Sequence, residues 1–166
     1  MARSVLFILG VGSIGWGLLS FFAGSYLPDW MGLSGAEHGE LYIESLAINA
    51  GLWPALGIFA LFGAAFQRLR LAATLAFVVS AAGLVGGRVL AIANGAEPGV
   101  YTGIALAAEV AMLLAASGGY VSEKTRLARE TREKKKAERA ALEAALEKEH
   151  AEAAAITAQV VPEQAD

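Results

Sequence analysis

The chain contains no cysteine and only two histidines among its 166 residues. Without a thiol there can be no disulfide, no thiol-based catalysis and no cysteine-ligated zinc or iron–sulfur cluster. His38 and His150 both lie outside the long apolar stretches, which disfavours haem ligation within such a stretch. The sequence therefore predicts no metal site and no cofactor.

Charged residues are scarce as well. They make up 17% of the chain, whereas hydrophobic residues make up 56%; a soluble domain has roughly a quarter charged residues. The charge is also unevenly placed, because eight of the 13 Lys and Arg residues lie between Lys124 and Arg139. The first 120 residues are almost free of charge, which is typical of an integral membrane protein.

Four apolar stretches each approach the roughly 20 residues that a helix needs to cross the hydrocarbon layer. We expect the first to be a retained span, since no convincing signal-peptide cleavage site follows it. A tight turn at Gln67–Arg70 and a breaker-rich turn at Asn94–Pro98 separate the later stretches. The predicted fold class is all-α: a four-helix transmembrane bundle with a long charged C-terminal helix. The predicted domains are residues 1–120, with spans at 4–23, 45–66, 71–93 and 99–120, and a tail at 121–166.

The basic residues indicate an orientation, because Lys and Arg near span ends are retained on the cytoplasmic side. Arg3, Arg68, Arg70 and the tail fall on one side of the predicted membrane. The loop between the first two spans has no Lys or Arg, and its acidic residues are Asp29, Glu37, Glu40 and Glu44. We therefore expect both termini to be cytoplasmic.

Small residues recur at four-residue spacing in every predicted span, a pattern typical of close helix packing in membranes. Two interpretations fit the pattern: packing within the bundle, or a dimerisation face. Pro54 should kink the second span, because proline lacks a backbone N–H. The small residues are Ser13 and Gly17; Ala60 and Ala64; Ala82, Gly83, Gly86 and Gly87; and Ala111, Ala115 and Gly119.

Three polar residues lie at membrane depth: Asn49, Arg88 and Glu109, with Glu44 just outside them. At about 1.5 Å per residue, Arg88 and Glu109 differ by only about 7 Å in depth on neighbouring antiparallel spans. A charge pair is the simplest way to satisfy both residues. The pair would be either a structural lock that fixes helix register or part of a binding or protonatable site. A third alternative has Arg88 reaching the surface while Glu109 is protonated.

Several of these residues carry a resemblance. They are the segment Glu44–Leu52 (ESLAINAGL), the pair Gly87-Arg88, the turn Asn94–Pro98 (NGAEP) and Glu109. The chain resembles a bacterial family of four-helix integral membrane proteins catalogued as a domain of unknown function, over about residues 5–120. Leu46 and Ala50 replace an Arg and a Gly of the family pattern. The resemblance implies four spans, an association of Arg88 with Glu109 and a bacterial inner-membrane location, and it implies no chemistry.

The tail changes composition abruptly, and Gly118-Gly119 is a predicted hinge before it. From Glu123 to Ile156 there is neither Gly nor Pro, which predicts a long helix, and the end from Val160 should fray. Residues 123–139 hold eight basic and four acidic residues, whereas 140–166 hold one basic and six acidic. The basic residues predicted to face anionic membrane lipids are Lys124, Arg126, Arg129, Arg132, Lys134, Lys135, Lys136 and Arg139.

That basic stretch could instead serve only to retain the tail on the cytoplasmic side. A stripe formed by Leu142, Leu146, Ala153 and Ile156 could dock a protein partner or a second copy, although it is too short for a coiled-coil prediction. The sequence favours a non-enzymatic accessory or scaffold protein with no nucleic-acid partner. The alternative is a small-molecule or lipid binder or transporter that uses Asn49, Arg88 and Glu109. An enzyme is the least favoured class, because no nucleophile–base pair or phosphate-binding loop is evident.

Overall fold

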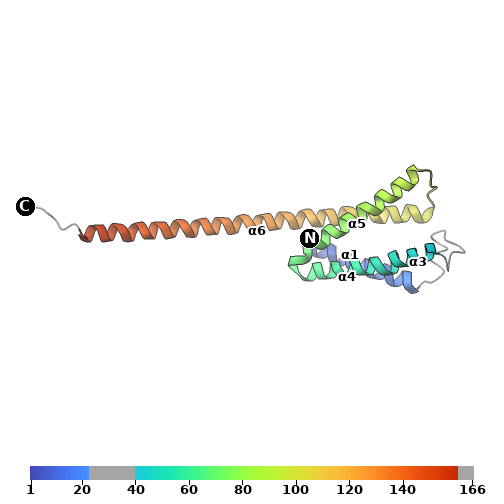
Figure 1. The fold of residues 1–166 in the computed structure, drawn as a ribbon, viewed down its shortest axis with the longest axis horizontal. Helices are drawn as coiled ribbons and strands as arrows, with labels where there is room; N and C mark the ends of the chain where they lie inside the picture. Colours follow the sequence, from blue (N-terminus) through green and yellow to red (C-terminus); the bar gives the residue numbers. More distant parts are fainter. Residues whose placement is uncertain (23–39, 161–166) are drawn as a thin grey trace, which may run out of the picture. The chain divides into compact units, whose positions relative to one another are not determined.

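The structure is a computed structural model, and it describes residues 1–22 and 40–160. The elements are α1 (Ala2–Phe22), α3 (Glu40–Leu46), η1 (Ala47–Leu52), α4 (Trp53–Ala65), α5 (Gln67–Ala93) and α6 (Val100–Val160) (Figure 1). Because α3, the π-helix η1 and α4 follow one another without a break, the described residues form four helical segments with no β-strand among them. The all-α prediction is confirmed.

Each of the four segments contains a stretch long and apolar enough to cross a membrane. These stretches lie within Ala2–Phe22, Ile43–Ala65, Gln67–Ala93 and Val100–Glu152. The chain divides into two compact units, Met1–Lys124 and Thr125–Asp166. The division falls four residues after the boundary predicted at residue 120, and α6 contributes residues to both units.

Two predicted breaks in the helices are wrong. Residues Gln67–Arg70 form the first turn of α5 instead of a separate connection, and the chain reverses at Phe66, which is extended at φ −105° and ψ 115°. Gln, Arg and Leu are strong helix formers, so one extended residue is enough to end α4. Gly118 and Gly119 are helical residues of α6, not a hinge. Gly119 is buried against Thr74, where an added Cβ would lie 3.4 Å from the Thr74 Cγ2 atom.

Pro54 lies in the first turn of α4, directly after the π-helix η1. A proline ring collides with the carbonyl four residues earlier in a regular α-helix and offers no N–H to it. In η1 the N–H of Trp53 donates to the carbonyl of Ile48, five residues earlier, and this wider turn accommodates the ring. The disturbance predicted at Pro54 therefore takes the form of a π-helical turn.

Small residues form the closest helix contacts in the first unit. An added Cβ at Gly17 would lie 2.0 Å from Pro54 Cγ, and one at Gly10 would lie 2.9 Å from the Gly57 carbonyl oxygen. These glycines allow α1 to approach the segment η1–α4 (Figure 1). The predicted packing within the bundle is correct for these buried residues: Ser13, Gly17, Ala60, Ala64 and Gly119.

The same prediction is wrong for the small residues of α5. Ala82, Gly83, Gly86 and Gly87 are exposed, and none of the three glycines has another atom within 4 Å of an added Cβ. On α6, Ala111 and Ala115 are also exposed. The buried residues of α5 are Ala73, Thr74, Phe77 and Ala81, so α5 packs in the bundle through its first half.

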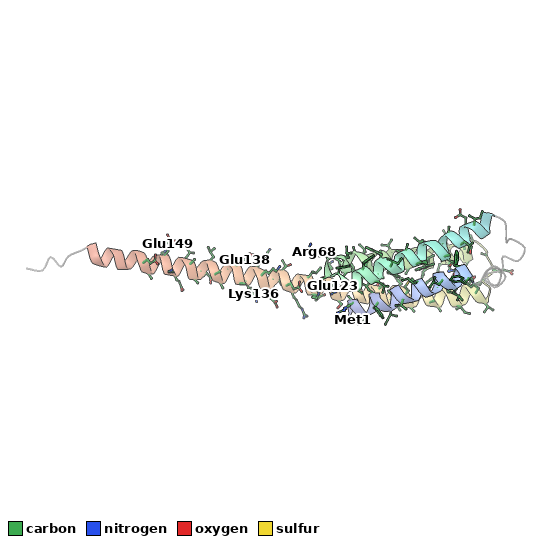
Figure 2. All side chains as sticks on the ribbon, turned by 90° about the horizontal axis from the view of Figure 1, so that it is seen from below. Met1, Arg68, Glu123, Lys136, Glu138 and Glu149 are labelled. Carbon is green, nitrogen blue, oxygen red and sulfur yellow. The ribbon has the colours of Figure 1, made fainter. Side chains whose placement is uncertain are left out.

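Met1, Arg68 and Glu123 lie at the same end of the first unit (Figure 2). The contact between Gly118 and the Met1 side chain and the ion pair between Arg70 and Glu123 agree with this placement. Glu44 lies in α3, near the start of the helical segment that continues through η1 and α4, and it is exposed. The predicted loop residues Asp29 and Glu37, the side chain of Glu40 and the frayed end at 161–166 lie outside the described residues.

Candidate functional site

Arg88 of α5 and Glu109 of α6 form a buried ion pair. The Arg88 Nε group donates to both carboxylate oxygens of Glu109, at 3.0 Å to Oε1 and 2.9 Å to Oε2. The Glu109 side chain is 8% exposed and the Arg88 side chain is 25% exposed. The pairing that the sequence predicts from depth and adjacency is therefore present in the structure.

The connection between α5 and α6 places the two residues opposite each other. Gly95 adopts a φ of +93°, which favours glycine, and α6 begins at Val100, so the two helices are antiparallel neighbours. Tyr101, in the first turn of α6, places its ring 5.6 Å from the Arg88 Cζ atom. A guanidinium over an aromatic face gains a cation–π interaction, and Tyr101 thus adds a second contact that orients Arg88.

Asn49 is held by partners other than the ion pair. Its Oδ1 accepts a hydrogen bond from the Trp16 indole N–H at 2.9 Å, and its Nδ2 donates to the Ser45 carbonyl at 2.9 Å. Asn49 therefore joins η1 to α1, whereas Arg88 and Glu109 join α5 to α6. The hydrogen bonds thus divide the predicted polar cluster into two separate contacts, and Glu44 is exposed on α3.

Sequence reasoning missed Trp16 as a functional neighbour of Asn49. A signal for it exists, because a buried indole N–H usually has an acceptor and Asn49 is the nearest amide on the neighbouring antiparallel span. Among the described residues, no buried side-chain nitrogen or oxygen lacks a hydrogen-bond partner. The polar groups inside the first unit therefore satisfy one another.

A second ion pair, also missed, joins α5 to α6 near the chain start. Arg70 Nη1 lies 3.9 Å from Glu123 Oε2, and the Glu123 side chain is 4% exposed. The Arg70 Nε also donates to the Gly63 carbonyl of α4 at 3.4 Å. Arg70 therefore links three helices, whereas the sequence analysis used it only as one of the basic residues that mark the cytoplasmic side.

The two ion pairs fix the register of α5 against α6. Arg70 and Arg88 are 18 residues apart, and Glu109 and Glu123 are 14 residues apart. At 1.5 Å per residue these separations are about 27 Å and about 21 Å. Because each helix offers two charges at comparable spacing, sliding or rotating one helix would break both pairs.

The predicted tail residues lie on α6. Lys124, Arg129 and the basic residues from Arg132 to Arg139 are exposed, and Arg126 is half-buried beside Glu130, with which it forms an ion pair. Leu142 and Leu146 are 63% and 47% exposed. Ala153 and Ile156 are helical, but their side chains lie outside the described part of the chain. In the described ranges, no three His, Asp or Glu side chains are grouped as a metal site would require.

Comparison with family models, with curated proteins and with solved structures found no match to the chain. The resemblance to four-helix membrane proteins and the bacterial inner-membrane location that it implies stay predictions.

Proposed function

We propose that the first unit is a four-span membrane bundle with both ends of the chain on the cytoplasmic side, and that the protein is a non-enzymatic accessory or scaffold subunit. In this proposal the charged tail binds a protein partner or the membrane surface. The observation that carries the scaffold role is the contrast between two parts of the chain. The described tail is an exposed, highly charged helix with few ion pairs, whereas the buried polar groups of the first unit have hydrogen-bond partners.

The distribution of side chains supports the membrane bundle. The buried positions of α1 are mostly small: Ala2, Leu6, Gly10, Ser13, Gly17 and Ser20. Its exposed positions are mostly bulky and apolar: Phe7, Ile8, Val11, Leu18, Leu19, Phe21 and Phe22. A helix of a soluble protein would bury these large side chains to remove them from water. Lipid removes that requirement, and small residues then allow backbones to approach.

The positions of the cations support the orientation. Arg3, Arg68 and Lys124 are exposed, and Met1, Arg68 and Glu123 share one end of the first unit (Figure 2). The turn at Asn94–Gly99 contains Glu97 and no Lys or Arg. Since Lys and Arg near span ends are retained in the cytoplasm, this asymmetry favours a cytoplasmic location for both termini.

Cysteine labelling tests this orientation, because the chain has no native cysteine. Ala96 and Lys124 are both exposed, and they lie at opposite ends of the predicted spans. In intact cells, an impermeant thiol reagent should label Ala96→Cys and leave Lys124→Cys unlabelled until the cells are opened. Labelling of Lys124→Cys alone in intact cells would reverse the proposed orientation.

The hydrogen bonds favour a structural lock over a binding pocket at the ion pair. Glu109 uses both carboxylate oxygens on Arg88, and Asn49 uses its amide on Trp16 and Ser45. The carboxylate of Glu109 and the amide of Asn49 are thus already engaged by neighbouring helices, which favours a structural role for both contacts. Binding specificity therefore belongs to the tail in this proposal.

The experiment compares full-length protein with a version that ends after Lys124, which keeps Glu123 and its contact with Arg70. Both are purified with a tag in mild detergent, and co-purifying proteins are quantified. The full-length protein should retain a stoichiometric partner or self-assembly that the shortened protein loses. A control with Lys134, Lys135 and Lys136 replaced by Gln separates charge-dependent binding from binding that needs only the helix. Monomers from both proteins, with a small molecule released by Glu109→Gln, would contradict the scaffold role.

A further inference from the structure

The tail helix, defined as residues 125–160 of α6, carries opposite charge in its two parts. Residues 126–139, the basic half, hold seven basic and three acidic residues. Residues 140–152, the acidic half, hold four acidic residues and one basic residue. All side chains from residue 131 to residue 152 are exposed. The tail helix therefore offers two adjacent surfaces of opposite sign.

Little of this charge is neutralised within the helix. Ion pairs in the described part of the tail include Arg126 with Glu130 and Lys148 with Glu152. The latter pair is 3.9 Å apart with side chains 80% and 68% exposed, so it is weak. A helix that is polar on all sides bridges domains through solvent, is stabilised by many such pairs, or is not stable by itself. The cations at Lys134–Lys136 and Arg139 have no ion-pair partner among the described residues.

We propose that the partner of the tail helix is the tail helix of a second copy of this chain, paired antiparallel. This inference rests on the scaffold role proposed above and names its partner. Antiparallel pairing about the middle of the tail helix places the last cations of each basic half, Lys136 and Arg139, beside carboxylates of the acidic half of the other copy. Parallel pairing would place Lys134–Lys136 beside the same three lysines of the other copy, and like charges at an interface are unfavourable. An anionic membrane surface would attract the basic half but repel the acidic half, whereas a second antiparallel tail supplies carboxylates to Lys136 and Arg139 and cations to Glu149 and Glu152.

The residues near the middle of the tail helix fit this arrangement. If Ala144 lies opposite its own copy, Arg139 lies opposite Glu149 and Lys136 lies opposite Glu152. Leu142 and Leu146 then lie opposite each other, and their exposed apolar surfaces cover one another at the centre. One register therefore brings together opposite charges on both sides of an apolar centre.

Cross-linking of the full-length protein tests the pairing, because cysteines can be introduced singly into a cysteine-free chain. Ala137, Ala144 and Ala151 are exposed and lie at equal distances along the helix. In mild detergent with a short bismaleimide, Ala144→Cys should cross-link alone. Ala137→Cys mixed with Ala151→Cys should cross-link several-fold more than either does alone. Cross-linking of Ala137→Cys with itself at the level of the mixture would indicate parallel pairing and overturn the proposal.

Charge reversal provides the control. Replacement of Lys136 and Arg139 by Glu should reduce cross-linking several-fold, and a second copy with Glu149 and Glu152 replaced by Lys should restore it. High salt should reduce the cross-linking of the unreversed tails, because salt screens exposed charges. Loss of cross-linking without restoration in the reversed mixture would overturn complementary pairing.

The outcomes also separate this inference from the scaffold proposal. If no tail cross-links but a different stoichiometric partner binds the full-length protein and is lost after truncation at Lys124, the second copy is ruled out and the scaffold role stands. If the full-length protein binds nothing, both fail. In vesicles, cross-linking between separate populations would place the two copies in facing membranes.

Discussion

Replacement of Arg88 and Glu109, singly and together, should show that the two residues act as a unit. Each single replacement by Leu leaves the other charge without a partner inside the bundle. Breaking a buried ion pair in this way typically costs about 3–5 kcal/mol of folding free energy. Replacement of both partners by apolar residues is often neutral or stabilising. We therefore expect the free energy of unfolding of the double variant to lie within about 1 kcal/mol of that of the parent protein.

The two single variants should differ in a defined direction. Arg88→Leu removes the ion-pair partner of the Glu109 carboxylate, and the Glu109 side chain is 8% exposed. Glu109→Leu removes the ion-pair partner of the Arg88 guanidinium, and the Arg88 side chain is 25% exposed. A long Arg side chain can move its charge toward the membrane surface, but Glu109 is too short and too deep to do so. Arg88→Leu should therefore be the more destabilising replacement, and Glu109→Leu should fall near the lower end of the range.

The assay is reversible unfolding in mixed micelles, with the free energy of unfolding measured for the parent, both single variants and the double variant. Val89→Leu combined with Val110→Leu is the matched control, because both valines neighbour the pair in sequence and are exposed. The free energy of unfolding of this control variant should stay close to that of the parent protein. A double variant whose loss equals the sum of the two single losses would refute the coupling between Arg88 and Glu109.

Three further predictions concern the other contacts of the first unit, each measured as a free energy of unfolding in the same micelles. Gly17→Ala places a methyl group against Pro54 and should cost about 1–3 kcal/mol, whereas Gly12→Ala, which meets no atom within 4 Å, should have little effect; equal effects would contradict the close approach of α1. Trp16→Phe removes the donor to Asn49 and should cost about 1–3 kcal/mol, since the amide oxygen is left unpaired; an unchanged stability would argue against that hydrogen bond. Glu123→Gln removes the charge beside Arg70 and should cost more than Glu130→Gln, because the Glu123 side chain is 4% exposed, whereas the Glu130 side chain is 44% exposed in an i,i+4 pair worth about 0.2–0.5 kcal/mol; the reverse order would contradict the burial of Glu123.

The sequence predicted the four helices because lipid-spanning length and low charge leave few alternatives for the first 120 residues. It placed their ends less well, since composition does not define how a chain reverses. The turn expected at Gln67–Arg70 is helical because those residues favour a helix, and Phe66 alone makes the reversal. The π-helical turn before Pro54 was not predictable in form, because several local distortions can accommodate a proline.

The ion pair at Arg88 was predictable because two ionisable residues at similar depth on neighbouring helices have few other partners. The contact between Arg70 and Glu123 was not predicted, since both residues lie at a span end, where a charge can equally face water. The separation of Asn49 from the pair also lay beyond the sequence. Depth alone does not say which face of a helix a residue occupies, and the close contact of Gly17 with Pro54 turns Asn49 toward Trp16.

Among the described residues, side-chain polar contacts help to tie the helices of the first unit together, one between α1 and η1 and two between α5 and α6. They are Trp16 with Asn49, Arg70 with Glu123, and Arg88 with Glu109. Apolar contacts alone specify register poorly in lipid, because lipid tails are as apolar as the side chains that they would replace. Polar contacts supply that register, and in doing so they use the hydrogen-bonding capacity that a ligand site would need. The charges of the tail are not used in this way, so recognition of a partner is expected there.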